Sequence, residues 1–141
     1  EYLETMGVPV VGYQTDEFPA FYSAESGLRV DVRVESAAEV VEIARTHWGL
    51  GLTGAILVVV PPPAEAALPA GRVEREIQAA LRDAREQNIH GARVTPFLLS
   101  KVAELSGGAS LEANLALLKQ NARVGAEIAA ALADRKGIAQ A

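Results

Sequence analysis

Two short apolar runs limit most strongly what this 141-residue chain can fold into. The first is Val8-Pro9-Val10-Val11-Gly12-Tyr13, and the second runs from Gly54 to Val60. Neither alternates apolar with polar side chains, which is typical of β-strands buried on both faces in a parallel sheet. The chain is therefore predicted to be an α/β protein with three layers, α/β/α, and a largely parallel central sheet that this chain leaves incomplete.

Periodic apolar residues and capping residues predict the other elements. Segment 28–35 alternates valines with charged residues, which is typical of a half-solvated strand at a sheet edge. The expected helices run from the N-cap Ser36 to Gly49 or Gly51, from about Gly71 to Asn88, from Pro96 to Leu105 after the N-cap Thr95, and from the N-cap Ser110 to about Asp134. Residues 1–6 are expected to end a helix at Gly7, inside a longer protein, and residues 135–141 to form a flexible tail.

Composition excludes several classes of protein. The net charge is -5, and no basic stripe is present that could neutralise a nucleic-acid backbone or an anionic membrane. The longest apolar run, residues 55–63, is far shorter than the roughly 20 residues that span a bilayer. Cysteine is absent, which excludes disulfides and thiolate sites and fits a reducing compartment. We expect a globular cytoplasmic protein with no nucleic-acid or membrane partner.

Polar side chains follow the first apolar run. Residues 14–27 form a turn-rich stretch that begins Gln14-Thr15-Asp16-Glu17, at the carboxyl end of the predicted strand. Ligands commonly bind there in parallel sheets, so Thr15 and Asp16 are candidates for hydrogen bonds to a ligand or for acid–base chemistry. The alternative is that these side chains are simply solvated on a polar loop.

The last predicted helix carries two asparagines in an otherwise apolar segment. Asn114 and Asn121 are seven residues apart, so both project from nearly the same helix face. A buried amide must find hydrogen-bond partners, and these come either from a ligand or from the protein itself. Both interpretations stay open on spacing alone.

Three stretches in a fixed order carry a family resemblance. They are residues 7–21 (GVPVVGYQTDEFPAF), residues 94–99 (VTPFLL) and residues 110–114 (SLEAN) continuing to Asn121-Ala122. Together they resemble the C-terminal half of the pseudouridine-5'-phosphate glycosidases, also called indigoidine synthase A-like proteins. The resemblance extends from residue 1 to about residue 134.

The resemblance implies an enzyme of nucleoside catabolism, a pseudouridylate synthase of the carbon–oxygen lyase class. Such an enzyme reversibly cleaves the C–C glycosidic bond of pseudouridine 5'-phosphate to uracil and ribose 5-phosphate. It uses a lysine Schiff base, a glutamate acid and a manganese ion, and it forms a homotrimer. The lysine, the glutamate and the metal ligand are expected upstream, in the N-terminal half of the same protein. No catalytic or metal-binding residue is therefore assigned to this chain, and the isolated chain is expected to be inactive.

At single residues, the resemblance assigns one substrate contact to this chain and reveals one difference from the family's pattern. The asparagine of the family's Ser-Leu-x-x-Asn motif corresponds to Asn114. Val60 stands where relatives commonly have asparagine, which bears on substrate preference. Two alternatives remain: a sugar-phosphate or nucleotide binding module without chemistry, and a structural half-domain that needs a partner segment to fold.

Overall fold

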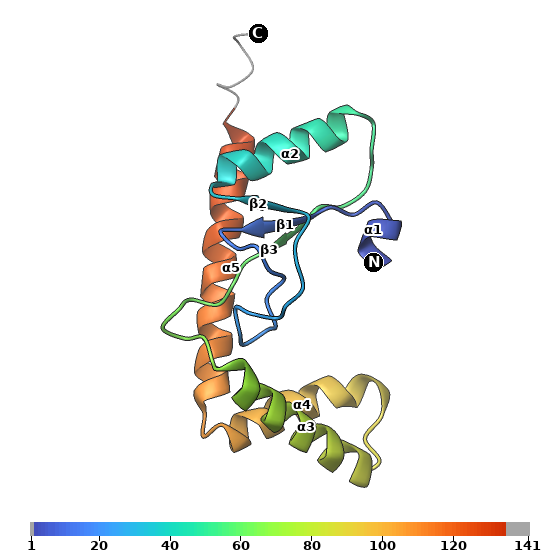
Figure 1. Cartoon of the computed structure of the whole chain (residues 1–141), viewed down its shortest axis with the longest axis vertical. Helices are drawn as coiled ribbons and strands as arrows, with labels where there is room; N and C mark the ends of the chain where they lie inside the picture. The colour runs from blue at the N-terminus through green and yellow to red at the C-terminus, as the bar shows by residue number, and fades with distance from the viewer. Residues whose placement is uncertain (1, 135–141) are drawn as a thin grey trace.

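The computed structural model describes residues 2–134, with the three strands in the first half of the chain and only helices after the third strand (Figure 1). Glu1 and the predicted tail, residues 135–141, lie outside the described residues. The elements are α1 (Tyr2–Thr5), β1 (Val10–Tyr13), β2 (Val32–Val34), α2 (Ala37–Gly49), β3 (Leu57–Val59), α3 (Ala70–Glu86), the 3-10 turn η1 (Gly91–Arg93), α4 (Val94–Leu105) and α5 (Ala109–Ala133). The first helix ends at Thr5, and the predicted terminating glycine, Gly7, follows it with a left-handed backbone of φ +66°.

The three strands form one parallel sheet in the order β2-β1-β3. In its register Val11 faces Val32 on one side and Val58 on the other. The prediction of an α/β fold with a parallel sheet is thus confirmed, with the first apolar run as the central strand and the alternating segment at an edge. The edge strand is shorter than predicted because its first half pairs with the loop after β1, through a bridge between Glu17 and Arg29.

Helices α2 and α5 cover one face of the sheet, where the main core lies (Figure 1). The core's buried residues are Val11, Tyr13, Val34, Val40 and Val124. Burying a valine side chain contributes roughly 1.5–3 kcal/mol relative to leaving it in water, so this cluster fixes α5 against the sheet. Helix α2 begins as predicted, because the Ser36 hydroxyl accepts a hydrogen bond from the backbone N–H of Glu39 at 3.4 Å.

Helices α3 and α4 pack together at the far end of α5, away from α2 (Figure 1). Their separate core contains the buried residues Tyr22, Val73, Ala80, Val102 and Ala113. Tyr22 comes from the loop after β1 and Ala113 from α5, so this core ties the helical pair to the sheet. Within residues 2–134, none of the helices combines the length and hydrophobicity that crossing a membrane requires.

Two predicted N-caps are wrong. Thr95 lies inside α4, because the turn η1 leads directly into Val94 and starts the helix earlier. Ser110 lies inside α5, whose N-cap position is Gly108 with φ +92°. Ser110 is buried, and its backbone N–H donates to the Ser106 hydroxyl at 3.1 Å. The left-handed double glycine turns the chain so sharply that Ser106, rather than Ser110, satisfies this helix start.

Candidate functional site

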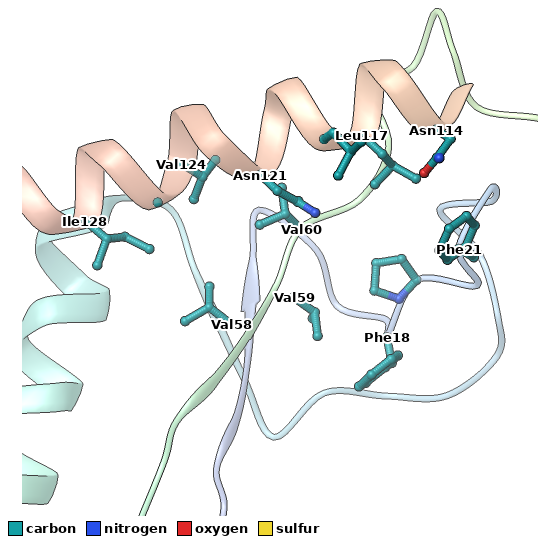
Figure 2. A pocket seen from close by; sticks show the side chains of 13 residues that line it. Phe18, Phe21, Val58, Val59, Val60, Asn114, Leu117, Asn121, Val124 and Ile128 are labelled. Carbon is teal, nitrogen blue, oxygen red and sulfur yellow. The ribbon is translucent and has the colours of Figure 1, made fainter. Parts of the chain in front are cut away.

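A cleft of about 510 Å³ lies at the carboxyl ends of the parallel strands. Three parts of the chain form it: the loop after β1, the end of β3 and one face of α5 (Figure 2). The lining residues are Phe18, Pro19, Phe21, Val58, Val59, Val60, Asn114, Leu117, Leu118, Asn121, Val124, Gly125 and Ile128. Parallel sheets bind ligands in this position, so the cleft is the candidate site.

Helix α5 brings Asn114 and Asn121 to the same wall of the cleft, which confirms the prediction that they share a face. Asn114 is half-buried and Asn121 is exposed. Figure 2 shows Asn114 at the end near Phe21, and Asn121 further along the helix above Val60. In the part of the chain that the structure describes, neither side-chain amide has a hydrogen-bond partner. Both amides are therefore available to a ligand, as donors and as acceptors.

The opposite wall is a loop, residues 14–27, that Glu17 holds in shape. The Glu17 carboxylate accepts hydrogen bonds from the backbone N–H groups of Ser26 and Gly27, each at 2.8 Å. These bonds, from Gly27 first and Ser26 second, lower the pKa of Glu17 because they stabilise its charged form. The loop thereby presents Phe18 and Phe21 to the cleft.

Gly12 lets this loop fold back over β1. A Cβ atom at Gly12 would clash with the backbone carbonyl oxygen of Thr15 and would lie 2.9 Å from a methyl carbon of Val30. The loop also passes through left-handed backbone conformations at two non-glycine residues, Gln14 with φ +58° and Phe21 with φ +44°. Such conformations are uncommon outside glycine and cluster at functional sites.

Thr15 and Asp16 do not line the cleft. The Thr15 hydroxyl is buried and donates to the backbone carbonyl of Glu17 at 3.0 Å. The Asp16 carboxylate is exposed and forms an ion pair with Arg33 of β2 at 2.7 Å. Both side chains thus interact with other groups of the protein in this structure. A ligand role for either residue stays a prediction.

Sequence reasoning missed the aromatic wall of the cleft. Phe18 and Phe21 lie in the motif that carries the resemblance, yet they were not considered as site residues. A usable signal was their spacing around Pro19 directly after a buried strand, since a turn there directs side chains over the sheet's carboxyl edge. Apolar walls with a few polar groups are typical of small-molecule sites.

The described lysines lie away from the cleft. Lys101 in α4 forms ion pairs with Glu104 at 3.2 Å and Asp83 at 3.4 Å. The hydrogen bond to Glu104, foremost, raises the pKa of Lys101 and keeps it protonated. Lys119 is exposed on α5. Among residues 2–134, no group of three or more His, Cys, Asp and Glu side chains is placed to hold a metal ion.

Comparison with known proteins adds to this geometry. The model of the family described as "Indigoidine synthase A like protein" matches residues 1–131. The chain belongs to the indigoidine synthase A-like family. It is 52% identical over 132 residues to a pseudouridine-5'-phosphate glycosidase of Caldanaerobacter subterraneus subsp. tengcongensis, covering 94% of this chain and 43% of that protein. It is also 50% identical over 129 residues to a pseudouridine-5'-phosphate glycosidase of Petrotoga mobilis, covering 92% of this chain and 42% of that protein.

Two solved structures share the fold of this chain. One is the prealnumycin C-glycosynthase AlnA in complex with ribulose 5-phosphate, with a TM-score of 0.83, 37% identity, and coverage of 93% of this chain and 43% of that one. The other is an indigoidine synthase A-like protein from Thermotoga maritima, with a TM-score of 0.80, 40% identity, and coverage of 90% and 41%. The resemblance predicted from the motifs is confirmed. This indigoidine synthase A-like chain spans less than half the length of the relatives it matches.

Proposed function

We propose that this chain supplies one wall of the active site of a pseudouridine-5'-phosphate glycosidase. The complete enzyme would reversibly cleave the C–C glycosidic bond of pseudouridine 5'-phosphate with water, giving uracil and ribose 5-phosphate. The observation that carries this proposal is the free amide of Asn114, half-buried in an apolar cleft at the carboxyl ends of the strands. The 52% identity to a pseudouridine-5'-phosphate glycosidase, in an alignment that covers 94% of this chain, supports the same reaction.

The residues of the cleft suit a ligand that is partly planar and rich in hydrogen-bonding groups. The Asn114 amide offers two N–H donors and a carbonyl acceptor, which match the carbonyl and N–H edge of uracil or the hydroxyls of a sugar phosphate. Phe18 and Phe21 offer apolar area against a base, and they displace water from the hydrogen bonds beside them. This chain's contribution is thus to bind and orient the substrate.

The chemical step is proposed to come from outside the described residues. The resemblance implies a lysine Schiff base, a glutamate acid and manganese, and the lysines of α4 and α5 lie away from the cleft. We assign no step in this chain to those groups. The isolated 141-residue chain is therefore proposed to be inactive, with Lys101 held as an ion-paired ammonium. Homotrimer formation, completion by an N-terminal half and a cytoplasmic location are further parts of this proposal.

Val60 bears on substrate range. It lines the cleft beside β3, where the resemblance expects an asparagine. An apolar side chain there removes one hydrogen-bonding group from the wall and leaves the polar contacts of this region to α5. We propose that Val60 changes the preference among related substrates rather than the type of reaction.

Substitution of Asn114 in the complete enzyme tests the proposal. Losing an orienting hydrogen bond in a closed site should cost about 1–3 kcal/mol, so Asn114→Ala should lower kcat/KM roughly 5- to 150-fold while the melting temperature stays unchanged. Asn121→Ala, on the same face of α5, is the matched control and should have the smaller effect. Wild-type kinetics for Asn114→Ala, or equal losses in both variants that follow a lowered melting temperature, would make Asn114 a structural residue.

A further inference from the structure

The loop wall of the cleft contains a tight turn whose two central side chains have opposite surroundings. Backbone hydrogen bonds run in both directions between Ala20 and Ser23, at 2.9 and 3.0 Å, and close the turn. Phe21, with φ +44°, is 53% exposed and lines the cleft, whereas Tyr22 is 4% exposed. The two rings meet edge to face, with centroids 4.6 Å apart. Because the turn is closed, the place of Tyr22 determines where Phe21 lies.

Tyr22 connects this turn to the two other parts of the chain that form the cleft. Its backbone carbonyl accepts a hydrogen bond from the N–H of Leu68, in the segment after β3, at 2.8 Å. Its ring belongs to the buried cluster that includes Ala113 of α5. Burial, foremost, raises the pKa of Tyr22, and a hydrogen bond with the Ser110 hydroxyl of α5 lowers it in part. A bond that lowers this pKa favours the phenolate, so Ser110 is its donor.

Ser110 connects Tyr22 to the asparagine of the cleft. It is 1% exposed, and its hydroxyl accepts a hydrogen bond from the Ser106 hydroxyl, after the end of α4, at 3.1 Å. Asn114 follows Ser110 by four residues, so the two occupy successive turns on one side of α5. Figure 2 shows Asn114 at the end of the cleft near Phe21. The buried hydroxyl of Ser110 therefore fixes the part of α5 from which Asn114 projects.

We propose that Tyr22 and Ser110 are positioning residues, whose mutual hydrogen bond holds the Asn114 amide at a fixed place opposite Phe21. Neither side chain lines the cleft, so both act through Asn114 and not on a ligand. The serine and the asparagine of the segment 110–114 thus have a shared task, in which one holds the turn of α5 and the other meets the substrate. This inference rests on the proposed function, because it assumes that Asn114 orients the substrate.

Tyr22→Phe in the complete enzyme tests the proposal, since it removes the hydroxyl and keeps the ring. Because the Asn114 amide loses its support, kcat/KM for pseudouridine 5'-phosphate should fall about 5- to 20-fold. Tyr2→Phe, at a side chain that is 74% exposed and outside the cleft, is the control and should keep the wild-type value. In an Asn114→Ala background, Tyr22→Phe should change kcat/KM less than about 2-fold. Losses that multiply, or a wild-type value for Tyr22→Phe, would overturn the proposal.

Ser110→Ala removes the other partner of the bond and should reproduce the loss in kcat/KM. Ser100→Ala, exposed on α4, is its control and should keep the wild-type value. Since the two hydroxyls share one bond, the double variant Tyr22→Phe/Ser110→Ala should lose less than about 2-fold beyond either single variant. Independent losses from an active wild-type enzyme would overturn this inference alone. Absence of uracil release by the wild-type enzyme would instead overturn the proposed function, and this inference with it.

Discussion

The two walls of the cleft are held in place by different kinds of interaction. The loop wall, residues 14–27, depends on polar contacts and backbone geometry, with Glu17 joining its two ends and Gly12 allowing its return over β1. The helix wall, α5, depends on apolar packing, with Val124 buried in the sheet core. The loop should therefore be sensitive to the addition of a single side-chain atom and to pH. Helix α5 should be sensitive to the loss of buried side-chain volume.

The largest effect is expected for Gly12→Ala. Because the added Cβ would clash with a backbone carbonyl, the loop must shift away from β1, at a cost of about 3 kcal/mol or more in the free energy of unfolding. Urea denaturation of the complete enzyme measures this. Gly49→Ala at the end of α2 is the control, since a Cβ there meets nothing within 4 Å, and its stability should be no lower than wild type because alanine favours a helix over glycine. Equal stability of both variants would refute the close approach of the loop.

On the helix wall, Val124→Ala should cost roughly 2 kcal/mol in the same denaturation measurement, through lost burial and the cavity that remains. Val124 is 1% exposed, so its methyl groups are fully packed against the sheet. Lys119→Ala, exposed on the same helix, should stay within about 0.5 kcal/mol of wild type. A negligible cost for Val124→Ala would mean that packing does not fix α5.

A smaller, local effect is expected for Glu17→Gln. The neutral amide weakens the two hydrogen bonds from Ser26 and Gly27, so these backbone amides should exchange faster while global stability changes little. Hydrogen exchange on the complete enzyme provides the readout. Glu25→Gln in the same loop is the control and should leave both amides protected. If the Ser26 and Gly27 amides exchanged at the wild-type rate in Glu17→Gln, Glu17 would not be the residue that holds the loop in shape.

The smallest effect is a pH dependence confined to the loop. Because the folded pKa of Glu17 is lowered, its contribution is present above the ordinary glutamate pKa of about 4.3 and is lost as pH falls through the lower folded value. The amide chemical shifts of Ser26 and Gly27 should titrate below pH 4.3, and Glu17→Gln should abolish that titration. A midpoint at or above the ordinary value would contradict the observed hydrogen bonds.

The regular parts of the fold could be predicted from the sequence because one local pattern determines each of them. Short apolar runs without alternating polar residues identified β1 and β3, and the spacing of Asn114 and Asn121 placed both on one wall of the cleft. The predicted caps Thr95 and Ser110 failed for a tertiary reason. The turns before α4 and α5 set where each helix begins, and Ser106 satisfies a backbone group that the sequence seemed to leave to Ser110.

The loop wall could not be predicted, because its shape depends on contacts between residues distant in sequence. Asp16 forms an ion pair with Arg33, 17 residues later, and Glu17 accepts hydrogen bonds from the backbone N–H groups of Ser26 and Gly27. Local patterns carry no information on such pairs. From this loop the sequence suggested Thr15 and Asp16, whereas the loop residues that line the cleft include Phe18 and Phe21.

The most direct test of the central claim is uracil release by the complete enzyme from two isomeric substrates. Pseudouridine 5'-phosphate carries a C–C glycosidic bond, and uridine 5'-monophosphate carries a C–N bond to the same base. The account predicts uracil and ribose 5-phosphate in equal amounts from the first substrate, none from the second, and none from either with the isolated 141-residue chain. Release from uridine 5'-monophosphate alone, or no release from pseudouridine 5'-phosphate by a folded complete enzyme, would contradict it.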